Sequence, residues 1–255
     1  MLPGATKYTI ALLVLLGGFV VTPACARQAG GELRFPAAIS DELLRDLLEI
    51  GRVDPKSTRD PEAWKRWGQA PAANQESSMR AVIAALMGTR PPLSLAASIL
   101  AIARVESGWN PNSENPSSTA CGIFQFIKAT WENYGTTRES CFNPDLNAWA
   151  GVKHLTMLYE SHVEDQIRPL RLVTTELERV EWTYRMLYAY HYHGEGSALA
   201  PNGGDLEAQV AAENGLAQLK GFFSVLKKAT YVPPAHKVVR VARKPASGQA
   251  KRRRG

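Results

Sequence analysis

The stretch SLAASILAIARVESGW, residues 94–109, decides the fold of the central part of this chain. Its apolar residues recur at a spacing of four and then three, at Leu95, Ile99 and Ile102. That spacing puts them on one face of an α-helix. Ser94 is a favourable N-cap residue, so the pattern predicts a helix that starts there and ends near Ser107.

Glu106 lies four residues beyond Ile102 and continues the apolar face at the end of this helix. A carboxyl group in that place is partly desolvated, which disfavours its charged form and raises its pKa. A glutamic acid that keeps its proton near neutral pH can serve as a general acid. A glutamate that merely faces solvent in the last turn fits the same spacing, so periodicity alone leaves both interpretations open.

The rest of the chain is also patterned mainly as helix, apart from an irregular stretch at 108–120 that is rich in Asn, Pro and Ser. Further helices are predicted at 39–51, with Ser40 or Asp41 as the N-cap, and at 60–67, 77–86, 128–134, 144–159, 174–190 and 205–227. A turn rich in His and Gly is expected at 191–196, and an interruption of the last helix near Gly215. The predicted fold class is mostly α, with any sheet small and near residues 108–126.

The N-terminus has the three parts of a secretory signal peptide. Lys7 supplies the positive charge, residues 10–21 form a short apolar run, and Ala24-Cys25-Ala26 resembles a cleavage site. A membrane anchor is one alternative, but the run is shorter than the ~20 residues that a spanning helix needs. Lipid attachment at Cys25 is another, although the residues before it match the usual pattern poorly. We predict that residues 1–26 are removed and that the protein is exported to the periplasm or cell envelope.

Export affects how the cysteines are interpreted. Cleavage of the signal leaves Cys121 and Cys141 in the mature chain, and an even number in an oxidising compartment favours one disulfide. The bond would close a loop of about 20 residues and stabilise the fold by roughly 3 kcal/mol on the chain-entropy model. Two small, buried free thiols are the alternative.

The positive charge of the chain is concentrated in its C-terminal tail. Eight basic residues and no acid follow Pro233, whereas the whole chain has a net charge of +6. The folded part is therefore close to neutral, which gives no argument for nucleic-acid binding. We predict that residues 233–255 are disordered and contact an anionic surface, with an aid to solubility as the alternative.

Several short motifs occur in a fixed order along the central part of the chain. They are ESGWNP at 106–111, GIFQF at 122–126, Thr130-Trp131, Asn143-Pro144-Asp145 with Asn147, Gly151 and Leu155, and Ala189-Tyr190-His191 followed by Gly194 and Gly196. In this order they resemble the soluble lytic transglycosylase family, whose catalytic domain has a lysozyme-like fold. The resemblance covers roughly residues 93–225, and the order of the motifs is more specific than any one of them.

The resemblance implies a reaction and a set of site residues. Glu106 would protonate the oxygen that links N-acetylmuramic acid to N-acetylglucosamine, and the 6-hydroxyl of the sugar would then attack the anomeric carbon to leave an anhydro sugar. This chemistry is a carbon–oxygen lyase reaction that needs neither a cofactor nor a second carboxylate. Ser107 would orient Glu106 or the neighbouring loop, Gln125 would bind sugar in the cleft, and Tyr190 would lie near Glu106 and steady the reacting sugar.

One departure from the family pattern concerns His191, which occupies the place of an Asn. A histidine can donate a similar hydrogen bond, so the substitution affects the expected local geometry more than the chemistry. His191 and His193 could also be a metal pair, but no third ligand is apparent. We expect a hydrogen-bonded turn here and no metal.

Two other functions remain as alternatives. Glu114 lies in the irregular stretch and could activate water, which would make the enzyme a lysozyme-like muramidase; a solvated loop carboxylate is the simpler interpretation. An inactive wall-binding or assembly protein would keep the fold but would not require the acid.

The predicted organisation has four parts. After the signal peptide come a helical N-terminal extension at 27–92, the catalytic domain at 93–232 and the basic tail at 233–255. The expected partners are peptidoglycan glycan strands, with secretion or conjugation machinery of the envelope as a further possibility, and no nucleic acid.

Overall fold

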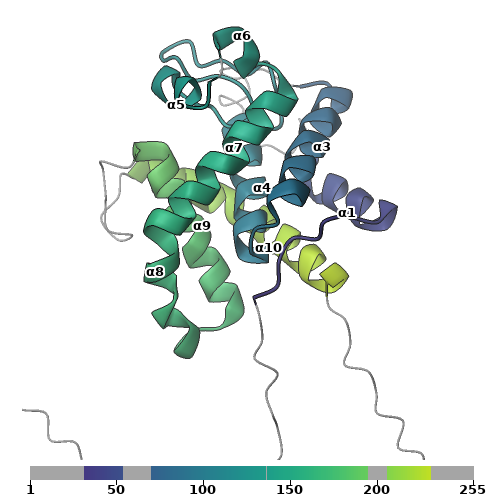
Figure 1. Ribbon diagram of the computed structural model, residues 1–255, viewed down its shortest axis with the longest axis vertical. Coiled ribbons are helices and arrows are strands. Elements are labelled where there is room, and N and C mark those ends of the chain that lie inside the picture. Colours follow the sequence, from purple (N-terminus) through teal and green to yellow (C-terminus); the bar gives the residue numbers. More distant parts are fainter. Residues whose placement is uncertain (1–31, 54–69, 136, 195–205, 231–255) are drawn as a thin grey trace, which may run out of the picture. The chain divides into compact units, whose positions relative to one another are not determined.

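The computed structural model describes residues 32–53, 70–135, 137–194 and 206–230 (Figure 1). The helices are α1 (Asp41–Gly51), α3 (Ala72–Thr89), α4 (Leu93–Ser107), α5 (Lys128–Asn133), α6 (Arg138–Cys141), α7 (Pro144–Leu158), α8 (Glu164–Ile167), α9 (Glu176–His193) and α10 (Leu206–Thr230). A π-helical turn, Tyr159–Val163, joins α7 to α8, and a 3₁₀ turn, Pro169–Leu172, follows α8. In these residues, extended pairing is limited to isolated bridges such as those of Cys121 with Glu114 and Phe126. The predicted mostly α class is confirmed, and the small extended pairs lie mainly where a sheet was expected.

The central helix is α4, which is enclosed by other helices on nearly all sides. Its residues 95–103 are all buried. It packs against α9 and α10 and also contacts α1, α3 and α7 (Figure 1). A helix that is apolar all round is stable only inside a core, so this sequence could not form a surface helix. Gly108 ends α4 in the left-handed conformation at φ 57°, just after Glu106 reaches the boundary of the core.

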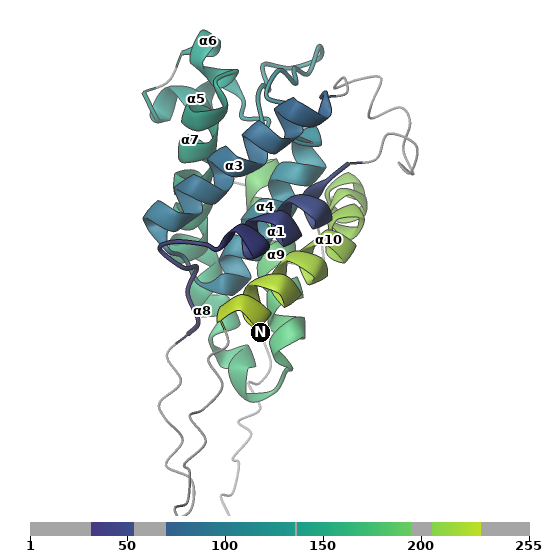
Figure 2. The same ribbon diagram turned by 90° about the vertical axis from the view of Figure 1, so that its right-hand side faces the viewer.

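The helices before residue 92 share the core of the later ones. Leu47 of α1 and Met79 of α3 belong to the same cluster of buried residues as α4. Helix α1 packs along α10, and α3 packs along α7 (Figure 2). The Gly51 carbonyl at the end of α1 accepts hydrogen bonds from Trp109 Nε1 at 2.9 Å and from Arg104 Nε at 3.2 Å. The N-terminal helices therefore hold the end of α4 in place.

The helix starts follow local capping chemistry. Ser40 caps α1 through its side chain, which accepts from the Leu43 amide at 3.1 Å, as predicted. Asn143 caps α7 in the same manner. The predicted cap of α4 is wrong, because Pro92 is the N-cap and Ser94 lies inside the first turn. Pro92 has ψ 146°, outside the helical range, and makes no side-chain capping bond.

The C-terminal half differs from the prediction in two places. Helix α9 continues through His191 to His193 and ends at Gly194, so the expected turn begins later than 191. Helix α10 passes through Gly215 without interruption. A Cβ at Gly215 would collide with the Tyr184 hydroxyl, so this glycine permits close packing of α10 on α9.

The irregular stretch between α4 and α5 is fastened to α6 and α7. Cys121 and Cys141 form the predicted disulfide, with their Cα atoms 6.1 Å apart. The Asn147 side chain accepts from the Phe124 amide at 3.1 Å. Gly122 has φ 75° and packs against the Cys141 carbonyl, a place where only glycine fits.

Several predicted segments lie outside the described residues: the signal peptide, the helix at 60–67 and the basic tail. Among the helices that are described, none combines the length and the apolar character that a membrane crossing requires.

Candidate active site

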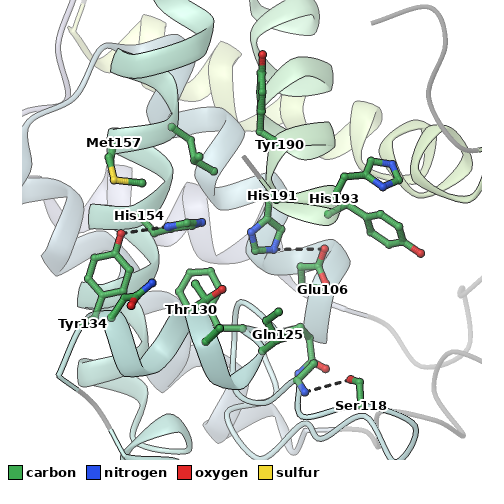
Figure 3. Close-up of a pocket in the computed structure, with 18 of the residues that line it drawn as sticks. Glu106, Ser118, Gln125, Thr130, Tyr134, His154, Met157, Tyr190, His191 and His193 are labelled. Carbon is green, nitrogen blue, oxygen red and sulfur yellow. Dashed lines mark hydrogen bonds and ion pairs between the residues drawn. The ribbon is translucent and has the colours of Figure 1, made fainter. Parts of the chain in front are cut away.

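A cavity of about 1050 Å³ lies at the end of α4 and is lined by residues of α4, α5, α7, α9 and the stretch before α5 (Figure 3). Its wall combines apolar side chains with neutral hydrogen-bonding groups such as Asn115, Gln125 and Tyr134. Among the described residues that line it, Glu106 is the one carboxylic acid. A cavity of this size and composition suits a sugar chain better than a strongly charged ligand.

The Glu106 carboxyl group is mostly removed from water. Only 14% of its side chain is exposed, and Oε1 has no hydrogen-bond partner within the described part of the chain. Burial raises the pKa of Glu106 to about 7, and a hydrogen bond from the Tyr188 side chain partly opposes that rise. A carboxyl group with this pKa is about half protonated at neutral pH, which satisfies the requirement for a general acid.

His191 lies directly against Glu106. Its Nε2 is 3.7 Å from Glu106 Oε1, and only 5% of its side chain is exposed. Burial, and next the charge of His154, lower the pKa of His191 to about 3. The imidazole is therefore neutral in the range where Glu106 titrates. Between about pH 3 and pH 7 the two groups are mainly a pair of neutral side chains, because Glu106 carries its proton and His191 does not.

Gln125 holds a backbone conformation that few residues other than glycine adopt, with φ 49°. Its amide nitrogen donates to the Gly122 carbonyl at 2.8 Å and to the Ser113 carbonyl at 3.2 Å. These two bonds fix the orientation of the amide and leave Oε1 buried without a partner among the described residues. The amide is thus held in one orientation in the cavity wall, and backbone strain of this kind is typical of binding sites.

Ser107 does not line the cavity. Its hydroxyl is buried and donates back to the Ala103 carbonyl at 3.3 Å, one turn earlier in α4. In this position Ser107 can affect Glu106 only through the shape of the last helical turn.

Tyr190 lines the cavity, but its hydroxyl points away from Glu106 (Figure 3). Its ring stacks on His162 at 4.8 Å between centroids, and its hydroxyl is 3.4 Å from Gln166 Nε2. The tyrosine that contacts Glu106 is Tyr188, which sequence reasoning missed. The spacing of Tyr184, Tyr188 and His191 by four and three residues, on one face of α9, is the signal that could have found it.

Two other interpretations concern Glu114 as a second acid and His191 with His193 as a metal pair. Glu114 forms an ion pair with Arg138, is half exposed and does not line the cavity. The rings of His191 and His193 point in different directions (Figure 3). In the described residues, no three potential metal ligands gather at one place.

A family comparison agrees with this geometry. Residues 91–199 match the model of the transglycosylase SLT domain, a span that contains every residue lining the cavity. No curated protein and no solved structure matches the chain. Members of this domain family are transglycosylase-type enzymes that act on peptidoglycan outside the cytoplasm, and the disulfide fits that location. By sequence match and helical fold, residues 91–199 of this chain are therefore similar to the transglycosylase SLT domain, which is lysozyme-like.

Proposed function

We propose that this protein is an exported lytic transglycosylase that cleaves the bond between N-acetylmuramic acid and N-acetylglucosamine and leaves anhydromuramyl ends. The observation that supports this proposal is one buried carboxyl group, Glu106, with a raised pKa in a cavity where no other carboxylate of the described residues lines the wall. Two-carboxylate glycosidases place a second acid about 5–9.5 Å from the first. A single acid favours a reaction in which the sugar supplies its own nucleophile.

Glu106 acts twice in the proposed reaction. Its proton passes to the glycosidic oxygen as the bond from that oxygen to the anomeric carbon breaks. The resulting carboxylate then takes the proton of the 6-hydroxyl, whose oxygen forms the new bond to the anomeric carbon. No water is consumed, and Glu106 ends in its starting form. Tyr188, which bonds to the carboxyl group, stabilises the charged form between the two steps.

The remaining groups bind rather than react. Gln125 binds the sugar through the part of its side chain that lines the cavity, since an amide can hydrogen-bond a sugar hydroxyl or acetamide. Tyr190 contributes an aromatic wall farther from the acid. Ser107 keeps the last turn of α4 in shape through its bond to Ala103.

Two observations weigh against the alternatives. A two-carboxylate hydrolase would need a second acid to activate water, and Glu114, the residue considered for that role, is engaged with Arg138 away from the cavity wall. A binding protein without activity would gain nothing from a buried acid whose ionisation costs free energy.

The test is the mass of the soluble products released from purified sacculi. Anhydro products lack one water relative to the products of a hydrolase and have no reducing end. Reducing muramic ends would contradict the lyase proposal and favour the muramidase. Release of nothing by the wild-type protein would favour the binding protein.

A further inference from the structure

Lys153 of α7 is the one lysine or arginine among the described residues that line the cavity. Its side chain is exposed, and no acid in the described part of the chain forms an ion pair with it. Other exposed lysines of the fold, such as Lys220 and Lys227, pair with acids of neighbouring helices. Lys153 is therefore a cation at the cavity rim whose charge the described protein does not neutralise.

Two aromatic rings hold the Lys153 ammonium group in place. Nζ lies 4.8 Å from the centroid of the Trp149 ring and 5.7 Å from that of Tyr134, both within the range of cation–π attraction. The two rings contact each other edge to face at 6.2 Å. Trp149 stays 46% exposed, although a tryptophan normally buries most of its surface. The rings thus preorganise a cation that would otherwise sample many positions in water.

A chain of contacts connects this rim to the acid. The Tyr134 hydroxyl is 3.0 Å from His154 Nδ1, and the His154 ring lies 6.4 Å from that of His191 (Figure 3). His191 in turn contacts Glu106. Lys153 and Glu106 therefore belong to one continuous wall, and a ligand that extends along this wall from Glu106 reaches the ammonium group.

We propose that Lys153, positioned by Trp149 and Tyr134, forms a subsite for a carboxylate carried on the sugar chain. This inference rests on the proposed function, because peptidoglycan is a glycan with such groups. The lactyl substituent of N-acetylmuramic acid ends in a free carboxylate when it bears no peptide. When it bears one, the stem peptide supplies carboxylates of its own. The cavity would thus distinguish muramic-acid glycans from neutral polymers of N-acetylglucosamine.

The test compares three soluble glycans of equal length: one with peptide stems, one with free lactyl carboxylates, and one with the lactyl groups blocked as neutral amides. The variant Lys153→Met removes the charge and keeps the chain length. Lys228→Met is the matched control, because Lys228 is exposed on α10 and lies outside the cavity wall. We expect Lys153→Met to lower kcat/KM about two- to fivefold on a charged glycan and to leave the neutral glycan unchanged, as an exposed charge pair predicts. Lys153→Arg should retain the preference.

The pattern of losses identifies the source of the carboxylate. A loss on the stem-bearing glycan alone assigns it to the peptide, and a loss on the peptide-free glycan assigns it to the lactyl group. An equal loss on all three glycans, or no loss on any, overturns the subsite.

A binding experiment separates this proposal from the lyase assignment. The three glycans are titrated against Glu106→Gln with and without the additional change Lys153→Met. Weaker binding of the charged glycans alone supports the subsite even if the wild-type protein cleaves nothing. Unchanged binding overturns it even if cleavage yields anhydro products.

Discussion

His191 Nε2 lies 3.7 Å from Glu106 Oε1, and the pKa values of the two groups shift away from each other. Burial raises the pKa of Glu106 to about 7 and lowers that of His191 to about 3. A protonated histidine would stabilise the carboxylate and take away the acid function. Because the imidazole is neutral, the proton of this pair stays on Glu106, where a general acid needs it.

Replacement of the acid is the most direct test of its role. Glu106→Gln keeps the shape of the side chain and removes the proton, so we expect cleavage of soluble glycan to fall by about 10²–10⁴-fold. Glu114→Gln is the control, and we expect it to leave the rate within about twofold, since its ion pair is exposed and weak. A wild-type rate in Glu106→Gln would show that another group supplies the proton.

Stability should depend on pH through both members of the pair. The raised pKa of Glu106 means that the folded state resists its ionisation, so stability is lost between pH 4.5 and about 7 and stays lower above that range. The lowered pKa of His191 means that stability is lost as pH falls from 6.5 to about 3. Each slope amounts to about 1.4 kcal/mol per pH unit, and the two oppose each other between pH 4.5 and 6.5.

Single variants should separate the contributions of Glu106 and His191 to the pH dependence of stability. In chemical denaturation, Glu106→Gln should gain stability as pH rises from 4.5 to 6.5, and by pH 8 it should exceed the wild type by about 3 kcal/mol. His191→Asn should lose stability over the same range. If neither variant changes the pH dependence, the two groups titrate in the folded protein as they do in water.

Tyr188 should shift the pKa of Glu106 rather than supply the catalytic proton. Tyr188→Phe removes a hydrogen bond that favours the charged form of Glu106, so the pKa of Glu106 should rise further. The alkaline limb of the profile of kcat/KM against pH should then move to higher pH, while the maximum rate falls. Tyr190→Phe is the matched control, because its hydroxyl points away from Glu106 (Figure 3). Equal shifts in both variants would show that the effect does not come from the contact with Glu106.

The disulfide should support both stability and activity. Cys121 directly precedes Gly122, which packs against the Cys141 carbonyl, and this contact helps to shape the stretch that carries Gln125. We expect reduction to lower the free energy of unfolding by roughly 3 kcal/mol on the chain-entropy model, with a lower Tm. Activity on soluble glycan should fall as well. The double variant Cys121→Ser with Cys141→Ser should show the same loss and no response to reductant; a further response would place the effect of the reductant elsewhere.

Sequence patterns predicted the scaffold of the site better than its details. The spacing of Leu95, Ile99 and Ile102 placed Glu106 at the end of a helix with one buried face, but it left open whether the carboxyl group is desolvated or faces solvent. The role of Tyr188 could not be predicted with the same ease, since it depends on how α9 is rotated against α4. His191 was expected in a turn because glycines follow it, yet the helix continues until Gly194 ends it.

The hydrogen bonds from Trp109 and Arg104 to the Gly51 carbonyl have a consequence for modularity. The family match begins at residue 91 and ends at 199, whereas α1, α3 and α10, which enclose the helix of the acid, all lie outside it. The smallest part of this protein that keeps the core complete is therefore longer than the segment that matches the family. A gene fusion that transplanted residues 91–199 alone would carry Glu106 without α1, α3 and α10, which help to bury α4. We expect the carboxyl group to become more exposed to water there, and its pKa to fall toward the ordinary value.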